Sequence, residues 1–515
     1  MTTGALGKEA PSPDQLRKGS LGTWDAVAMA IAVLSPAMAM AYNTTGVAAT
    51  AGGSTPLAVL LGGVACLCLA FVVVGFTRRM ASAGYAYTYA SRSLGQSTGF
   101  LTGWLYTFGF FCFVPMTMAG VGGFTRDLIK NEVWSTEPDW MWFIYFLVGM
   151  AFLIYLAVFG IKLTARTQLV VGAVTVAVIV VLDVIVTAKG GKNGQSLQPF
   201  TFGHTLSGGF NGIFYGIILG VTSFIGFESA AVLGEETRNP RRAIPLATIV
   251  AVVFAIVFYV WTTYSMAIGF GVNNGAAWAK DPTALATTAQ VYSGHTLSIL
   301  ISIAAILSAF VVCLACANAA ARTMFAMGRE GTLPAVFGRT HPVYKTPVNA
   351  ILGVTAVATV VAALIGFFWD YGGGPTTVYF LMASIGTIAI ILVYMALCLG
   401  GVAFFRRLMR KWNPIVHAVL PAIGFIIFGL AVYGSIYPGA LPPMPYRIVP
   451  YVNLGWLALG IVLLWYLRTN HPQRVSRIGS ILGEEGGEEA GALDEAPGPS
   501  GMKPTEPTAG MANPD

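Results

Sequence analysis

The sequence predicts an all-α protein that crosses a membrane many times, and three observations lead to this prediction. Of the 515 residues, 56% are hydrophobic and only 10% are charged, whereas soluble domains carry about 25% charged residues. Twelve apolar runs divide the chain, and most reach the roughly 20 residues that a helix needs to cross a bilayer. The basic residues, finally, are distributed very unevenly between the two groups of loops that these runs create.

The apolar runs are expected to be helices, because segments in lipid must satisfy their own backbone hydrogen bonds and the alternation typical of a β-barrel is missing. The runs cover residues 24–46, 56–76, 99–123, 140–159, 168–187, 209–234, 245–270, 296–319, 348–368, 376–400, 418–435 and 452–467. They define a transmembrane domain of twelve helices over residues 21–468, preceded by a cytoplasmic segment over residues 1–20. The Gly-, Pro- and Glu-rich tail over residues 469–515 is expected to be disordered and cytoplasmic.

Charge placement predicts the orientation of these helices. With the N-terminus inside the cell, 23 of the 29 Lys and Arg residues fall on the cytoplasmic side. The six on the other side are Arg126, Lys130, Lys189, Lys192, Lys280 and Arg447. Because cytoplasmic loops are enriched in basic residues, both termini are expected in the cytoplasm and the protein in the plasma membrane. The net charge of +7 therefore reflects topology, and no nucleic-acid partner is expected.

Two of the runs contain residues that interrupt helices. The first run carries Ser35-Pro36 near its middle, and proline there removes a backbone donor and clashes with the preceding turn. The sixth run carries Ser223, Gly226 and Glu228 at a similar depth. These runs are five apart and antiparallel, which suggests two inverted five-helix repeats around a central site. Two unrelated kinks are the alternative, since Pro and Gly are common in membrane helices.

Three sequence blocks resemble the amino acid–polyamine–organocation (APC) superfamily of permeases. The blocks are ASAGYAYTYASRSLGQSTGFLTGWLY at 81–106, FIGFESAAVLGEETRNPRRAIP at 224–245 and ANAAARTMFAMGREGTLPAVFGRTHPVYKTP at 317–347. The resemblance extends from about Gly22 to Leu467. It implies the LeuT-type fold, a 5+5 inverted repeat with two extra helices. It also implies a secondary active transporter for an amino acid or related amine that works by alternating access, as a proton-coupled symporter or an exchanger.

The chain departs from the family pattern at two places. Many members carry a glycine-rich signature in the first helix break, where this chain has LSPAMA at residues 34–39. Some proton-coupled members place a lysine in the fifth helix in the position of a bound sodium ion. The matching segment here, VVGAVTVAVIVV, has no lysine, and Thr175 lies near the expected position. A lysine-based coupling mechanism is therefore not transferred to this chain.

Broken helices offer backbone groups that suit the two charges of an amino acid. The positive end of a half-helix suits a carboxylate, and carbonyls at the C-terminal end of another half-helix suit an ammonium. The predicted substrate-binding residues are Ser35, Pro36, Ala37, Met38 and Ala39 in the first break and Ser223, Phe224, Ile225, Gly226 and Phe227 in the second. Phe224 and Phe227 are candidate aromatic gates, with ordinary packing as the alternative.

Glu228 is predicted to be a coupling or gating residue. A carboxylate within a membrane costs roughly 2.5–3.5 kcal/mol on insertion scales and by default has a function. Glu228 is expected to carry a proton or to form a gate pair, for which Arg322 is a candidate partner. A static structural pair and direct contact with a cationic substrate are the alternatives. Asp183, near the end of the fifth run, is expected to be interfacial.

Other classes of protein fit the sequence less well. A polyamine or organic-cation transporter of the same fold remains an alternative, because one central glutamate suits a positive substrate. A polytopic membrane enzyme would need clustered His, Asp or Glu near one membrane face, and the sequence has no such cluster and no nucleotide-binding motif. No enzymatic activity, metal or cofactor is expected. The predicted partners are a small-molecule substrate, the lipid bilayer and, as a candidate coupling ion, the proton.

Overall fold

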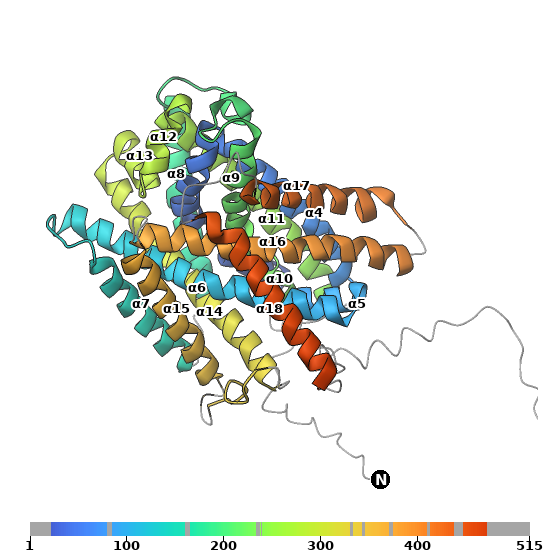
Figure 1. Ribbon diagram of the computed structural model, residues 1–515. Helices are drawn as coiled ribbons and strands as arrows, with labels where there is room; N and C mark the ends of the chain where they lie inside the picture. Colours follow the sequence, from blue (N-terminus) through green and yellow to red (C-terminus); the bar gives the residue numbers. More distant parts are fainter. Residues whose placement is uncertain are drawn as a thin grey trace, which may run out of the picture.

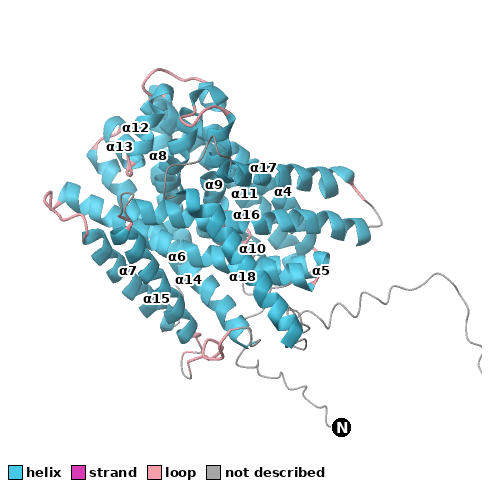
Figure 2. Ribbon diagram, in the orientation of Figure 1, coloured by secondary structure: helices cyan, strands magenta, loops and turns pink. Residues whose placement is uncertain are grey.

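The computed structural model of the chain describes residues 22–79, 85–159, 165–232, 237, 239–329, 333–341, 344, 346–369, 374–408, 412–436 and 446–470. The predicted N-terminal segment (1–20) and the predicted tail beyond residue 470 lie outside these ranges. Within them, helices joined by loops form the whole fold, without a β-strand (Figure 2). The apolar runs fold into helices, because every backbone group then finds its partner inside the same segment.

The helices follow the predicted runs closely. The long helices are α4 (Thr55–Thr77), α6 (Gln96–Glu132), α7 (Met141–Val158), α8 (Ala165–Lys189), α11 (Pro240–Phe270), α14 (His295–Arg329), α15 (Val348–Phe368), α16 (Pro375–Leu408), α17 (Leu420–Ile436) and α18 (Val449–Asn470). The shorter elements are α1 (Thr23–Leu34), α2 (Pro36–Met38), the π-helix η1 (Ala39–Asn43), α3 (Thr44–Ala51), η2 (Gly52–Ser54), α5 (Tyr85–Leu94), η3 (Gln198–Phe200), η4 (Phe202–His204), α9 (Phe210–Phe224), α10 (Ser229–Val232), η5 (Val272–Asn274), α12 (Gly275–Lys280), α13 (Ala284–Tyr292), the π-helix η6 (Ile415–Val419) and η8 (Tyr446–Ile448).

Ten helical segments among the described residues are long and apolar enough to cross a membrane. Ten of the twelve predicted runs have a counterpart among them, the second run within the segment Pro36–Thr77. The two that do not stand alone are 24–46 and 209–234, and both are interrupted near the middle. The chain is therefore a multi-pass membrane protein, and its two interrupted runs fold into shorter helices, such as α1 and α9.

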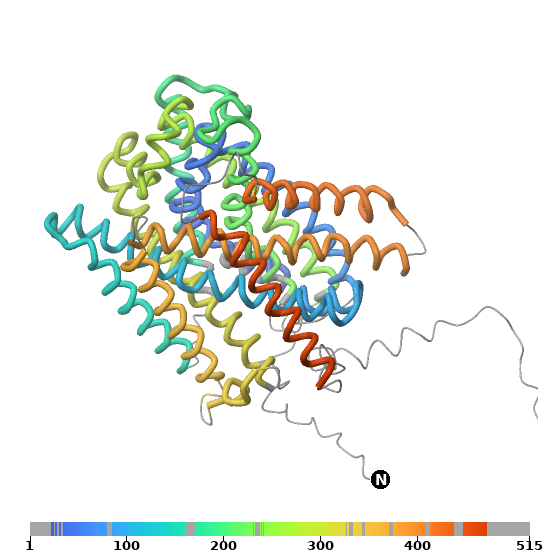
Figure 3. The backbone as a smooth tube through the Cα atoms, in the orientation of Figure 1, coloured from blue at the N-terminus to red at the C-terminus, as the bar shows by residue number. Residues whose placement is uncertain are grey.

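The centre of the molecule is formed by α6, which packs against α16 and against α14 (Figures 1 and 3). Glycines allow α6 and α16 to approach closely. A Cβ on Gly109 would lie 2.7 Å from the Ile390 side chain, and one on Gly386 would lie 2.7 Å from the Phe113 ring. Small residues at such contacts let helix backbones pack tightly in membranes. The broken segments α1–α3 and α9–α10 lie beside this central group, with α3 packed on α9 and α14 packed on α2.

Candidate functional site

The first helix break occurs at Ser35, between α1 and α2. Ser35 has φ 48° and ψ 61°, a left-handed conformation that costs a residue with a side chain roughly 1–2 kcal/mol. Its Oγ donates to the carbonyl oxygen of Ser308 at 2.9 Å and lies 2.5 Å from Ser308 Oγ. The carbonyl of Leu34 accepts a hydrogen bond from the Tyr259 hydroxyl at 3.3 Å. The Tyr259 side chain of α11 therefore satisfies the Leu34 carbonyl, and Ser308 Oγ of α14 accepts from the Met38 amide, two backbone groups that the break leaves without helical partners.

The second break separates α9 from α10. Helix α9 ends at Phe224, Ile225 is extended with φ −60° and ψ 130°, and Gly226 has φ 113°. Only glycine adopts such a φ without steric cost, so Gly226 is the residue that permits the turn. The helical path resumes at Ser229.

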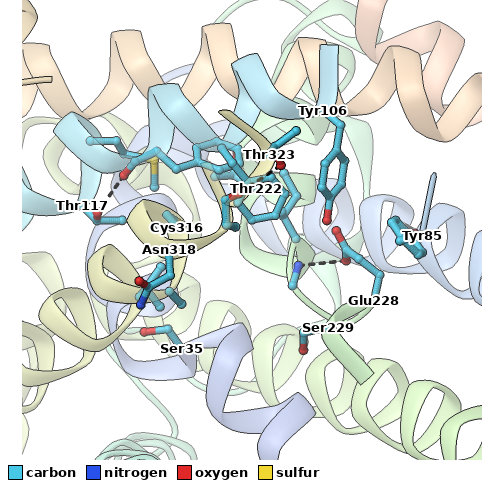
Figure 4. A pocket seen from close by; sticks show the side chains of 18 of the residues that line it. Ser35, Tyr85, Tyr106, Thr117, Thr222, Glu228, Ser229, Cys316, Asn318 and Thr323 are labelled. Atoms are coloured by element: carbon cyan, nitrogen blue, oxygen red, sulfur yellow. Dashed lines mark hydrogen bonds between the residues drawn. The ribbon is translucent and has the colours of Figure 1, made fainter. Parts of the chain in front are cut away.

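Both breaks face one cavity of about 490 Å³. Its wall is mostly apolar or aromatic, with α6 contributing Phe100, Trp104, Phe110, Phe113 and Met116. The polar residues that line it are Ser35, Asn43, Tyr85, Tyr87, Tyr106, Thr117, Thr222, Glu228, Ser229, Asn318, Arg322, Thr323 and Tyr379. Figure 4 shows that Ser35, Tyr106, Thr222, Glu228 and Asn318, from helices far apart in the sequence, converge on the same space.

The predicted substrate-binding residues divide into two groups in the structure. Those that line the cavity are Ser35, Met38, Ala39, Ile225 and Gly226, together with Glu228. Those outside its lining are Pro36, Ala37, Ser223, Phe224 and Phe227, all of which are buried. The Phe224 ring packs edge-on against Tyr259 with centroids 5.1 Å apart, and the Phe227 ring lies 6.0 Å from Tyr394. The two phenylalanines therefore pack at the second break without lining the cavity.

Glu228 is 1% exposed and is held by two hydrogen bonds. Its Oε2 accepts from the Gly226 amide at 2.9 Å and its Oε1 accepts from the Tyr394 hydroxyl at 2.9 Å. Figure 4 shows the Tyr106 hydroxyl pointing toward the same carboxylate. Arg322 lines the same cavity, but among the described residues no cation lies within ion-pairing distance of Glu228. Hydroxyl and amide donors therefore replace a counter-ion at this carboxylate.

Two hydroxyls near Glu228 line the cavity with their hydrogen-bonding capacity unused. Tyr85 is 2% exposed, and neither its hydroxyl nor that of Ser229 has a hydrogen-bond partner among the described residues. Both side chains flank Glu228 in Figure 4. Because a buried polar group without a partner costs about 1–3 kcal/mol, these hydroxyls mark a place where a polar ligand or water would bind.

One end of the cavity is closed by a layer around Asn43 and Tyr379. Asn43 Nδ2 donates to Ser223 Oγ at 2.9 Å, and the Tyr379 hydroxyl donates to Asn43 Oδ1 at 2.8 Å. The Tyr379 ring stacks on Tyr42 with centroids 4.2 Å apart, and Tyr42 meets Phe124 edge-on. This layer, which we call the Asn43 layer, joins η1, α9, α16 and α6.

The other end of the cavity reaches the surface near Arg322. Met327 and Phe100 line this end, where they pack together, and the Arg322 side chain is exposed. Along α6 the distance from Thr117, near the Asn43 layer, to Phe100 is 17 residues, or about 25 Å at 1.5 Å per residue. The cavity is therefore elongated: the Asn43 layer closes one end, and the end at Arg322 is accessible.

Several cavity residues lie outside the sequence predictions. Tyr106, Cys316 and Asn318 come from α6 and α14, inside apolar runs, and Tyr85 comes from α5, between two runs. The resemblance blocks 81–106 and 317–347 include Tyr85, Tyr106 and Asn318 but not Cys316, and the resemblance does not distinguish lining residues from packing residues.

The expectation for Asp183 was wrong. Asp183 is fully buried, and its carboxylate accepts hydrogen bonds from Thr262 at 2.6 Å and from Ser265 at 2.5 Å, both on α11. Its position near the end of an apolar run suggested an interfacial residue, but α11 packs over α8 there. Asp183 joins α8 to α11 and does not line the cavity.

A multi-pass helical fold with two broken helices around an elongated cavity defines a membrane transporter. A family model described as "Amino acid permease" matches residues 21–463. The chain belongs to the amino acid permease family of the APC superfamily, which confirms the resemblance, and it is a secondary transporter.

Three curated relatives are similar over most of their length. The branched-chain amino acid permease BcaP of Bacillus subtilis is 25% identical over 472 residues, which cover 89% of this chain and 93% of that protein. The low-affinity putrescine importer PlaP of Escherichia coli is 28% identical over 358 residues, covering 67% and 74%. The methylthioribose transporter of Bacillus subtilis is 23% identical over 451 residues, covering 84% and 89%. These relatives carry small molecules, and their names place the chain among transporters rather than enzymes.

Proposed function

We propose that the protein carries an amino acid with an apolar side chain across the plasma membrane by alternating access. The observation that carries this proposal is the cavity at the two helix breaks, which combines a mostly apolar wall with a few polar groups. Ligand sites typically have this composition, with the polar groups fixing orientation. Similarity to a branched-chain amino acid permease over 89% of the chain supports an apolar side chain.

The proposed topology has twelve crossings, with a five-plus-five inverted repeat followed by two further helices. In this arrangement α1 with α2–α3 forms the first crossing, and α9 with α10 forms the sixth. The unequal distribution of basic residues supports cytoplasmic termini. The accessible end of the cavity at Arg322 then faces the cytoplasm, and the Asn43 layer closes the external side.

We infer that the substrate carboxylate binds at the first break, where the chain leaves only a few amides available. Proline 36 has no N–H, and the Ala39 amide donates to the Ser35 carbonyl at 3.1 Å. The Met38 amide donates to Ser308 Oγ at 3.2 Å, which is long for such a bond. A carboxylate forms shorter and stronger bonds with amides, so it would displace Ser308 from Met38.

The ammonium group is proposed to bind at the second break, near Ile225 and Glu228. The C-terminal end of α9 carries the negative end of the helix dipole, and Glu228 adds a carboxylate close to it. The unpartnered hydroxyls of Tyr85 and Ser229 complete a polar patch that suits an ammonium or its water shell. Glu228 is further proposed to take up a proton during the cycle, because an ionised carboxylate without a counter-ion is costly at this depth.

A cationic amine is the second candidate substrate, and a specific observation favours it. Glu228 lies in the cavity wall among the aromatic side chains of Tyr85 and Tyr106. A carboxylate next to aromatic faces is a typical site for an organic cation. Similarity to a putrescine importer agrees with this alternative.

Uptake into proteoliposomes tests the proposal and separates the two candidates. The purified protein is reconstituted and offered labelled leucine, valine, lysine and putrescine, with imposed proton or sodium gradients. Saturable uptake of leucine or valine driven by a proton gradient is the expected result. Preferential uptake of putrescine would show that a cationic amine is the substrate. If no compound is accumulated or exchanged, the protein transports neither amino acids nor amines of these kinds.

The role of Glu228 is tested with Glu228→Gln against a matched control. Glu137 is also buried and also accepts a hydrogen bond from a tyrosine, Tyr145, at 2.5 Å, but it does not line the cavity. Glu228→Gln is expected to abolish gradient-driven accumulation while exchange of substrate across the membrane persists. Glu137→Gln should leave accumulation intact. If both variants accumulate substrate with an unchanged pH dependence, Glu228 does not couple transport to protons.

A further inference from the structure

A second cavity, of about 880 Å³, lies between the end of α4, the first turns of α11 and the π-helix η6. Four arginines line it, namely Arg78, Arg79, Arg241 and Arg242, and all four are exposed. Among the described residues of its lining none is acidic. It shares no lining residue with the transport cavity, so substrate binding in that cavity does not account for the four arginines.

The arginines lie where positive charge is electrostatically unfavourable. Arg241 and Arg242 occupy the first turn of α11, which begins at Pro240, and the N-terminus of a helix carries partial positive charge that repels cations. Arg78 and Arg79 approach the same cavity from the end of α4. Topology requires only that basic residues lie on one side of the membrane, not that four converge on one cavity. An anion bound between Arg78, Arg79 and Arg242 would relieve this repulsion.

The remainder of the lining is apolar. Phe71, Leu246 and Ile249 line the same cavity, and Leu246 is 45% exposed. Leu246 and Ile249 lie four and seven residues beyond Arg242, about one and two turns further along α11. The cavity therefore has a basic rim at the end of the membrane-crossing helices and an apolar wall that continues toward the membrane interior.

We propose that this cavity binds an anionic phospholipid, with the headgroup phosphate on Arg78, Arg79 and Arg242 and an acyl chain along Phe71, Leu246 and Ile249. Guanidinium groups pair with phosphate through two parallel hydrogen bonds, and basic pockets between membrane helices recognise anionic headgroups. The apolar wall distinguishes a lipid from a free anion, because inorganic phosphate would gain nothing from it. Charge placement puts the cavity on the side that the sequence predicts to be cytoplasmic.

Binding is measured by native mass spectrometry of the full-length protein released from detergent, titrated with phosphatidylglycerol or with phosphatidylcholine of the same acyl chains. The test variant is the triple substitution Arg78→Gln, Arg79→Gln and Arg242→Gln. The control is Arg92→Gln, Arg339→Gln and Arg468→Gln, which removes three exposed arginines from the same predicted side but outside the cavity. A basic residue near an anionic headgroup contributes about fivefold in affinity, so the test variant should bind phosphatidylglycerol on the order of a hundredfold more weakly.

The expected result is saturable binding of phosphatidylglycerol, weak binding of phosphatidylcholine and full retention of binding in the control. Should the test variant not fold, Leu246→Glu is used instead, because a negative charge on the apolar wall repels the lipid and leaves the arginines in place. Equal losses in the test and control variants would overturn the proposal. Inorganic phosphate that binds as tightly as the lipid would overturn it as well. The proposal would also be overturned if the lipid bound only after Glu484, Glu485, Glu488 and Glu489 are changed to Gln, because the acidic tail would then occupy the cavity.

Discussion

Asn43 offers the most direct test of how the transport cavity opens. Its amide bonds to Ser223 on α9 and to Tyr379 on α16, and it is 2% exposed. In the Asn43→Ala variant Ser223 keeps a bond to the Leu219 carbonyl, whereas the Tyr379 hydroxyl loses the partner to which it donates. One lost bond costs about 1 kcal/mol and a buried hydroxyl without its partner about 1–3 kcal/mol, so the closed layer should lose about 2–4 kcal/mol.

This loss should shift the protein toward a state in which the Asn43 layer is open. If transport requires that layer to separate, the destabilisation affects only the closed state, and 2 kcal/mol changes the ratio of the two states about 30-fold. The native thiol of Cys316 is a suitable reporter, because it lines the cavity while the other five cysteines do not. A membrane-impermeant thiol reagent is applied to either side of oriented vesicles, and the labelling rate of Cys316 is measured.

Asn43→Ala is expected to raise labelling from the side that carries the Asn43 layer, while Tyr379→Phe should have a smaller effect in the same direction. Adding Cys316→Ser to the variant gives the background. Thr355→Ala is the control for general destabilisation, because Thr355 is buried in α15 and bonds only within its own helix. If Asn43→Ala leaves both the labelling rate and the uptake rate unchanged, the Asn43 layer is not a gate.

Three further predictions concern buried polar contacts. Ser308→Ala removes the acceptor of the Met38 amide and the partner of Ser35, so the measured substrate affinity should change. The control Ser302→Ala alters a bond inside α14 and should leave the affinity unchanged. Equal affinities of Ser308→Ala and the unmodified protein would contradict the proposed carboxylate site. Tyr394→Phe removes one donor to Glu228. It should lower the maximal uptake rate by roughly tenfold or more, because a hydrogen bond to a charged group contributes about 1.5–3 kcal/mol and each 1.36 kcal/mol is tenfold; wild-type rates would contradict this role. Asp183→Ala should lower the thermal unfolding midpoint by a few degrees without altering substrate affinity, and an affinity change would argue against a purely structural role.

The candidate site was only partly predictable from the sequence. Ser35-Pro36 and Gly226 lie at the two breaks, as predicted. Proline alone does not identify a break, because Pro115 lies inside the continuous helix α6 and Pro245 inside α11. Helix breakers do not say which side of an interrupted segment faces a cavity. Phe224 and Phe227 pack behind the break, while Tyr106 on α6 points at Glu228 (Figure 4).

The sequence by itself determined the class of this protein. Apolar length, the low content of charge and the biased loops leave a multi-pass helical protein as the only solution in a bilayer, since each segment must satisfy its own backbone. Three motif blocks added the permease family. These properties are local, because each depends on residues within one helix or loop.

Only the tertiary structure decided which side chains share a space. The Asn43 layer joins residues 180 and 336 positions apart in the chain, and Glu228 finds its donor 166 positions away on α16. The arginines of the second cavity meet across α4 and α11 in the same way. Such pairings depend on how each helix is rotated about its axis and on the angles at which helices cross. When a helix is apolar on every side, its hydropathy pattern does not predict which face meets a neighbour.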